Sequence, residues 1–299
     1  MRLYNTLVSA LAALLLLAAA AQAEQLTAPI GGGLSVEIWT PEEAQTEPVA
    51  ANAFGATIPA KPAKPFLKLF QPKKKVQLKP VILYVHGGGW IRGTRDKVYN
   101  LPAYAAARDY ILVSTDYRPV PRTNIDGQLA DVTRAVAWTQ KNIANYGGDP
   151  KRIVIMGHSA GAHLVALAAA RGKVPGIRGV IANDVQAYDM VQYAALRGSI
   201  DGVYLRAFGN SKSNWVRWSP ITYVRKGGRL PPHLVMYSNS HRPRRATISV
   251  AYAQELKSRG TPVTLYNGAR YTHGSIARDI GTSGEVTGVI DRFLKGVFR

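Results

Sequence analysis

A short glycine-flanked serine segment places the strongest constraint on how this 299-residue chain can fold. Residues 157–161 read Gly-His-Ser-Ala-Gly. They stand between the apolar run 152–156, which predicts a buried strand, and residues 160–170, which predict a helix. Glycines on both sides of Ser159 permit a sharp turn in which neighbouring backbones approach closely. A Gly-x-Ser-x-Gly pattern between strand and helix predicts a nucleophile elbow, in which an exposed serine can attack a carbonyl carbon.

A second glycine-rich segment supplies what such a serine needs to act on a carbonyl group. Residues 86–90 read His-Gly-Gly-Gly-Trp and follow the apolar run 80–85. Consecutive glycines present bare backbone N–H groups at the carboxyl end of a strand, where they can stabilise a developing oxyanion. A flexible turn is the alternative for a triple glycine in isolation. Its pairing with the elbow favours an oxyanion hole made by the amides of Gly87, Gly88 and Ala160.

These motifs together resemble the α/β-hydrolase superfamily, within it the hormone-sensitive-lipase-like and BD-FAE-type carboxylesterases and the kynurenine-formamidase-like enzymes. The likeness also includes Asp116-Tyr117-Arg118-Pro119, Tyr146-Gly147-Gly148-Asp149-Pro150, Ser219-Pro220 and Thr272-His273-Gly274-Ser275. The resemblance implies an α/β fold with a mostly parallel central sheet, flanking helices and a small cap region. It implies neither cofactor nor metal, and it implies the chain order serine, acid, histidine. On that pattern His273 is the general base.

The acid position departs from the family pattern. The family places an aspartate after the strand at 234–237, but residues 238–245 contain no carboxylate, and His241 stands at the acid position. In one interpretation His241 orients His273 in a Ser-His-His triad. In a second, Asp184, which follows the preceding apolar strand, supplies the acid. In a third, the chain has lost catalysis, since losing the carboxylate can lower turnover by up to ~10⁴.

The N-terminal residues predict export. Residues 1–23 contain Arg2, an apolar core from 7 to 20 and the sequence Ala-Gln-Ala at 21–23, which together are typical of a cleaved signal peptide. The apolar core is short for a stable membrane span, although an uncleaved anchor is the alternative. We expect a mature chain that begins at Glu24 and is periplasmic or secreted. The chain has no cysteine, so no disulfide supports the fold there.

Charge and composition distinguish a basic segment from the rest of the predicted mature chain. Residues 24–299 suit one α/β-hydrolase domain, in which residues from about 41 to 79 turn from alanine- and proline-rich to lysine-rich and predict a basic, partly disordered insertion. The formal net charge is +20, which favours attraction to an anionic surface or polymer. No specific nucleic-acid motif is present. The sequence does not indicate an oligomeric state.

Between residues 189 and 220 the chain is rich in aromatic side chains, which either line a substrate pocket or pack the cap. They are Tyr193, Tyr204, Phe208, Trp215 and Trp218.

The sequence therefore predicts an exported serine carboxylesterase that acts through an acyl-enzyme, with an atypical or displaced triad acid. Its substrate is expected to be a small-molecule or polysaccharide-linked ester. Two alternatives stay open: a catalytically impaired protein of the same fold that binds anionic polymers, and an amidase or peptidase of that fold.

Overall fold

The computed structural model describes residues 24–41, 77–238 and 243–299. The predicted signal peptide, most of the predicted basic insertion and His241 lie outside these ranges. Within them, no helix is both long enough and apolar enough to cross a membrane.

In the described part of the chain, eight strands form one sheet in the order β1-β2-β4-β3-β5-β6-β7-β8. They are β1 (Glu24–Gly31), β2 (Leu34–Thr40), β3 (Lys79–Val85), β4 (Ile111–Thr115), β5 (Gly148–His158), β6 (Gly179–Asn183), β7 (His233–Ser238) and β8 (Val263–Gly268). β1 pairs antiparallel with β2, and β2 with β4, whereas every pair from β4 to β8 is parallel. The mostly parallel sheet is as predicted.

The central strands are apolar on both faces because helices cover both. Along β3, Val81, Leu83 and Val85 belong to one hydrophobic cluster, and Ile82 and Tyr84 belong to the other. This alternation follows from the two-residue period of a strand.

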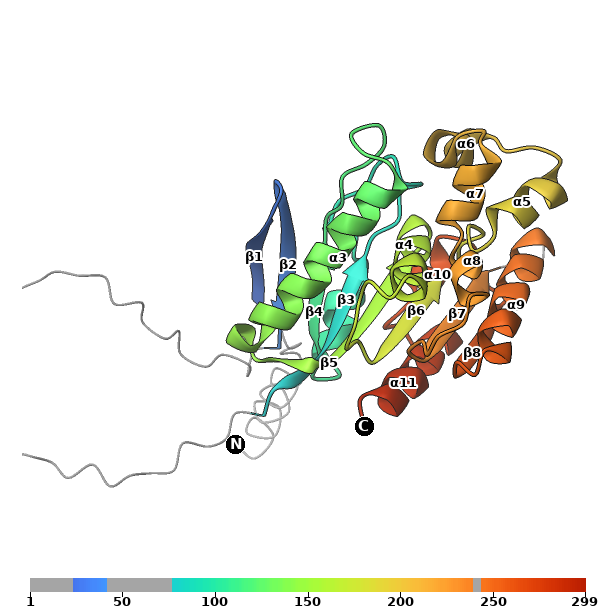
Figure 1. The fold of residues 1–299 in the computed structure, drawn as a ribbon. Helices are drawn as coiled ribbons and strands as arrows, with labels where there is room; N and C mark the ends of the chain where they lie inside the picture. The colour runs from blue at the N-terminus through green and yellow to red at the C-terminus, as the bar shows by residue number, and fades with distance from the viewer. Residues whose placement is uncertain (1–23, 42–76, 239–242) are drawn as a thin grey trace, which may run out of the picture.

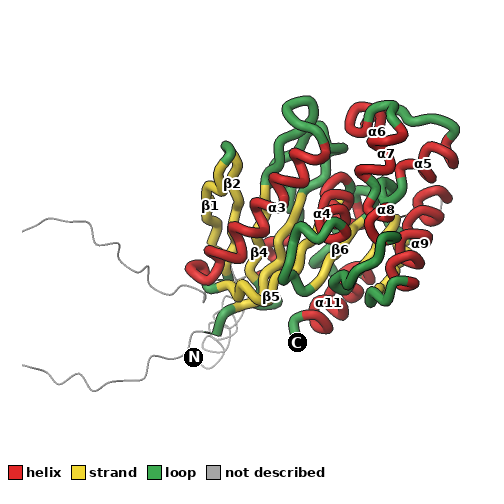
Figure 2. The backbone as a smooth tube through the Cα atoms, in the orientation of Figure 1, coloured by secondary structure: helices red, strands yellow, loops and turns green. Residues whose placement is uncertain are grey.

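Helices form the outer layers, as Figures 1 and 2 show. One cluster contains residues of α3 (Ile125–Asn142), α4 (Ala160–Ala170) and α9 (Pro243–Ser258). The other contains residues of α2 (Leu101–Ala106), α10 (Ser275–Arg278) and α11 (Glu285–Val297). The 3₁₀ turn η2 (Ile143–Tyr146) follows α3 and precedes β5. This three-layer arrangement is the α/β-hydrolase fold that the sequence predicted.

Local chemistry explains where the helices begin. The side chain of Asn124 accepts a hydrogen bond from the amide of Gly127 at 3.1 Å and so caps the start of α3. α4 is buried along nearly its whole length, and its run of alanines lets it pack closely against the sheet.

Four short helices between β6 and β7 form the small cap region. They are α5 (Met190–Arg197), α6 (Gly202–Phe208), α7 (Lys212–Trp218) and α8 (Pro220–Val224). Figure 1 shows α5, α6 and α7 together at the upper right of the molecule. In open α/β sheets, ligands bind outside the carboxyl ends of the strands, and the site lies there.

Candidate active site

The predicted nucleophile elbow is present between β5 and α4. Ser159 has φ 55° and ψ −121°, an uncommon backbone conformation for a residue with a side chain. The turn leaves no room for side chains beside it: a Cβ on Gly161 would lie 2.0 Å from the Val85 oxygen, and one on Gly157 would lie 2.3 Å from Gly161 backbone atoms. The amide of Ser159 donates to the Asn183 carbonyl at 2.9 Å, which ties the turn to β6.

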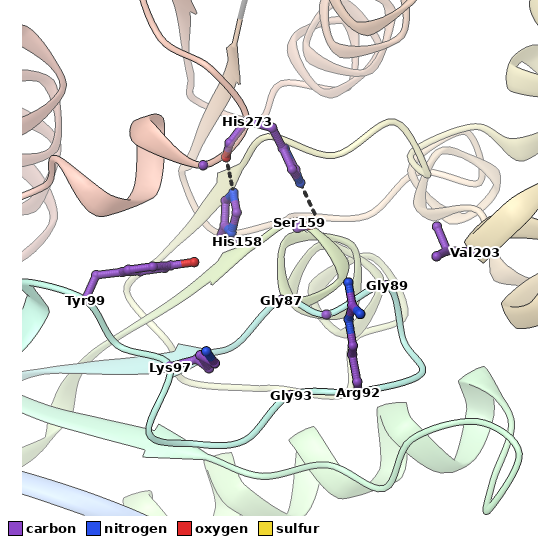
Figure 3. Close-up of a pocket in the computed structure, with 12 residues that line it drawn as sticks. Gly87, Gly89, Arg92, Gly93, Lys97, Tyr99, His158, Ser159, Val203 and His273 are labelled. Atoms are coloured by element: carbon purple, nitrogen blue, oxygen red, sulfur yellow. Dashed lines mark hydrogen bonds between the residues drawn. The ribbon is translucent and has the colours of Figure 1, made fainter.

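Three side chains from separate parts of the chain form a hydrogen-bonded series at this turn. Ser159 Oγ lies 3.0 Å from Nε2 of His273, and Nδ1 of His273 lies 2.7 Å from Oδ2 of Asp184. Ser159 follows β5, Asp184 follows β6, and His273 lies in the loop between β8 and α10. The order nucleophile, base and orienting carboxylate matches the geometry of a serine-hydrolase triad. Figure 3 shows His273 pointing at Ser159.

Asp184 is held by several donors besides His273. Its carboxylate accepts hydrogen bonds from the Ser238 amide at 2.8 Å and the Ser238 hydroxyl at 2.6 Å, and it pairs with the buried Arg245. Burial alone would raise the pKa of Asp184, but the hydrogen bond to His273 and the charge of Arg245 outweigh it and hold that pKa well below its usual range. Asp184 is therefore a carboxylate at neutral pH.

Of the two candidate acids, Asp184 is the one that the described residues bring to His273. β6 and β7 are adjacent and parallel, so their carboxyl ends open on the same edge of the sheet. A carboxylate after β6 can therefore reach the histidine that the family orients from the end of β7. His241 lies outside the described residues.

Arg245 is a component of the site that sequence reasoning did not identify. The sequence around position 245 favours a positive potential beside the site and binding of a carboxylate or phosphate group of the substrate. In the structure the Arg245 side chain is 7% exposed and pairs with Asp184. Its Nη1 lies 2.8 Å from Nδ1 of His273 and 3.3 Å from the Ser238 hydroxyl. When Nδ1 of His273 donates its proton to Asp184, it cannot also accept a hydrogen bond from Arg245. In that tautomer Arg245 therefore donates to Asp184 and not to the imidazole.

His158 supports the loop that carries the base. Its Nε2 donates to the His273 carbonyl oxygen at 2.7 Å, and the two rings lie 4.7 Å apart. Burial lowers the pKa of His158 to about 4. It is therefore neutral at neutral pH and adds no positive charge beside His273.

The glycine-rich segment lies beside Ser159. Gly87 and Gly88 line, together with Ser159 and His273, a pocket of about 640 Å³. Gly88 has φ +125°, and a Cβ there would lie 1.9 Å from the Arg92 oxygen, so only glycine fits. Ala160 is the first residue of α4, where backbone N–H groups have no acceptor within the helix.

The cap aromatics mainly pack against one another. Trp90 Nε1 donates to His163 Nδ1 at 3.1 Å, and Nε2 of His163 donates to the Trp218 carbonyl at 2.7 Å. Tyr204 and Phe208 place their rings 5.3 and 5.0 Å from the ring of Trp90. The cap contributes only Val203 to the pocket lining. Of the two roles considered for these aromatics, packing is the one observed.

Among the described residues, one group of ligand-type side chains is close enough for a metal ion, and it is the group at this site. His158, Asp184 and His273 each offer an atom within 4.8 Å of the others. Those residues already hydrogen-bond within the site, and Arg245 places a cation against Asp184. The arrangement does not suit a second cation.

Fold and site together define an α/β-hydrolase. Residues 67–195 match the BD-FAE family model. The chain therefore has the α/β-hydrolase fold, and over residues 67–195 it is similar to BD-FAE-type carboxylesterases.

Relatives that are similar to this chain in sequence include proteins named as esterases. The chain is 32% identical to the esterase LipQ of Mycobacterium tuberculosis over 203 residues, which cover 62% of this chain and 48% of LipQ. It is 27% identical to the isoprenylcysteine alpha-carbonyl methylesterase ICME of Arabidopsis thaliana over 228 residues, covering 69% and 53% of the two chains. The matched region thus spans about half the length of these relatives.

Solved structures agree on the fold. A thermostable esterase from Pseudomonas putida ECU1011 superposes with a TM-score of 0.67 at 19% identity, covering 94% of this chain and 84% of that one. Esterase 2 of Thermogutta terrifontis superposes with a TM-score of 0.66 at 18% identity, covering 93% of this chain and 94% of that one.

Proposed function

We propose that this protein is a serine carboxylesterase that hydrolyses esters through an acyl-enzyme. The observation that carries the proposal is the hydrogen-bonded series Ser159, His273, Asp184 beside a glycine-rich segment. The esterase names of its relatives support the same reaction class.

Each residue then has a defined step. Ser159 Oγ attacks the ester carbonyl carbon while its proton passes to Nε2 of His273, and the carbonyl oxygen takes up the negative charge. The amides of Gly87, Gly88 and Ala160 donate to that oxyanion. His273 returns the proton to the departing alkoxide, and the alcohol leaves. Water then attacks the acyl-enzyme by the same route, which releases the acid and restores Ser159.

Asp184 has the role of the triad acid in this proposal. Its carboxylate holds Nδ1–H of His273, so that Nε2 is free to accept the serine proton. Its negative charge stabilises the imidazolium that forms during each transfer. The triad acid is thus displaced from the end of β7 to the end of β6.

The test is turnover of p-nitrophenyl acetate together with fluorophosphonate labelling of the protein. We expect Ser159→Ala to abolish both, and labelled peptide to map to Ser159. The matched control is Ser213→Ala, which removes an exposed hydroxyl on α7 and should leave both unchanged. Absence of labelling in the wild-type protein would instead favour a non-catalytic binder of anionic polymers.

Export is a separate part of the proposal. The pattern of residues 1–23 supports cleavage after Ala23 and a periplasmic or secreted mature protein. The N-terminal peptide of the protein recovered from an exporting bacterial host should begin at Glu24 by mass spectrometry. An intact residue 1 in the exported fraction would contradict cleavage.

A further inference from the structure

The pocket in front of Ser159 has a positively charged wall. The loop that follows the glycine-rich segment contributes Arg92 and Lys97 to the lining, and none of the described residues that line the pocket is acidic. Figure 3 shows the Arg92 side chain extending from this loop toward the segment of Gly87 and Gly89, with Ser159 beyond it. A substrate bound in this pocket therefore meets these cations.

The loop is held in place by contacts on its inner side. Arg95 pairs with Glu37 at 2.9 Å and with Asp116 at 2.6 Å, and its carbonyl accepts from Ser114 at 2.7 Å. The Arg92 carbonyl lies so close to Gly88 that a Cβ there would meet it at 1.9 Å. The backbone that carries the two pocket cations is thus anchored next to the proposed oxyanion donors.

Arg92 and Lys97 differ from the neighbouring Arg95, which is paired with two carboxylates. Within residues 24–41, 77–238 and 243–299, neither Arg92 nor Lys97 has a carboxylate within ion-pair distance. Asp96, which is exposed and adjacent to Lys97, does not line the pocket. Arg245, behind the triad, is already paired with Asp184. The positive charge that faces the substrate is therefore that of Arg92 and Lys97.

We propose that the preferred ester carries an anionic group, of the carboxylate kind, positioned against Arg92 and Lys97. This inference rests on the proposed esterase function and names its substrate class. A guanidinium binds a carboxylate through two parallel N–H donors, and a lysine adds a point charge. Both side chains are exposed, so solvent screening limits the gain, and we expect the pair to favour an anionic ester by ~10-fold at low ionic strength.

Two matched pairs of esters test the proposal. The first places the charge on the alcohol side: 4-acetoxybenzoate against its neutral methyl ester. The second places it on the acyl side: the mono-4-nitrophenyl ester of adipic acid against its neutral methyl diester. For each pair the measured quantity is the ratio of kcat/KM for the anionic and neutral members.

The expected result is a preference for the anionic member in at least one pair. That preference should fall by ~10-fold in the double variant Arg92→Gln, Lys97→Gln, mainly through KM, and should shrink in 0.5 M salt. The control Lys151→Gln removes one positive charge from the exposed start of β5, about 25 Å along the strand from Ser159, and should leave the ratio unchanged.

The outcomes separate this inference from the proposed function. The anionic-substrate inference is overturned if, for both pairs, the double variant has the same kcat/KM ratio as the wild-type protein. In that case, labelling of Ser159 and turnover of the neutral esters would still support the esterase proposal. Absence of both labelling and turnover in the wild-type protein overturns the esterase proposal and this inference with it.

Discussion

Replacing Asp184 with asparagine removes one negative charge from the centre of the site and keeps the size of the side chain. The asparagine amide group can face Nδ1 of His273 as a donor, which turns the imidazole into the tautomer with a proton on Nε2. That tautomer cannot accept the proton of Ser159. The imidazolium also loses the carboxylate that lies 2.7 Å from Nδ1. We expect kcat to fall by ~10⁴, equivalent to about 5 kcal/mol of transition-state stabilisation.

The same substitution leaves Arg245 buried without its carboxylate. Breaking a buried ion pair by removing one partner costs about 3 kcal/mol or more, so stability has to be measured alongside activity. The assay is hydrolysis of p-nitrophenyl acetate at saturating substrate, with thermal unfolding of the same sample to verify that the variant is folded.

His241→Ala is the matched comparison, because His241 stands at the acid position that the family pattern suggests. We expect it to leave kcat nearly unchanged. A triad role for Asp184 is refuted if folded D184N keeps kcat within ~10-fold of the wild-type value, or if His241→Ala produces the loss expected of D184N.

Two further predictions concern the oxyanion donors and acid stability. Gly88→Ala places a Cβ 1.9 Å from the Arg92 oxygen and should displace the donor segment, lowering kcat by ~10²-fold or more in the p-nitrophenyl acetate assay; unchanged kcat would exclude Gly88 as a donor. Burial lowers the pKa of His163 and of His233 to about 4, so the unfolded chain binds more protons than the folded one between about pH 6.5 and 4. The free energy of unfolding therefore falls as pH falls through that window, by roughly 3 kcal/mol for each histidine. His233→Leu should reduce the drop in Tm between pH 7 and 4.5. A drop equal to that of the wild-type protein would contradict this explanation.

The elbow and the glycine-rich segment could be predicted because their signals are local. Strand, turn and helix around Ser159 occupy consecutive residues, and the steric need for Gly157 and Gly161 arises within the same turn. The assignment of His273 followed from its place after the strand that became β8. In the structure its Nε2 lies 3.0 Å from Ser159 Oγ.

The acid was not predictable from local pattern. Choosing between Asp184 and His241 requires knowing that the end of β6 reaches the same histidine as the end of β7, and Asp184 and His273 are 89 positions apart. Arg245 was missed for a related reason. A run of arginines usually forms a solvated surface, but Arg245 is buried, with the carboxylate of Asp184 from the end of a distant strand against it.

The sequence alone determined the fold class of the chain. Apolar strand segments, a glycine-flanked serine and a glycine-rich segment are each made of consecutive residues, so they can be recognised without knowing which distant segments meet. Only the tertiary structure shows that Asp184 is hydrogen-bonded to His273, that Arg245 is its buried counter-charge, and that Arg92 and Lys97 line the pocket. These depend on strand order and on loops meeting across the sheet edge. Contacts of that kind have no signature in the spacing of residues along the chain, because the free energy that selects them comes from packing and charge pairing between distant segments.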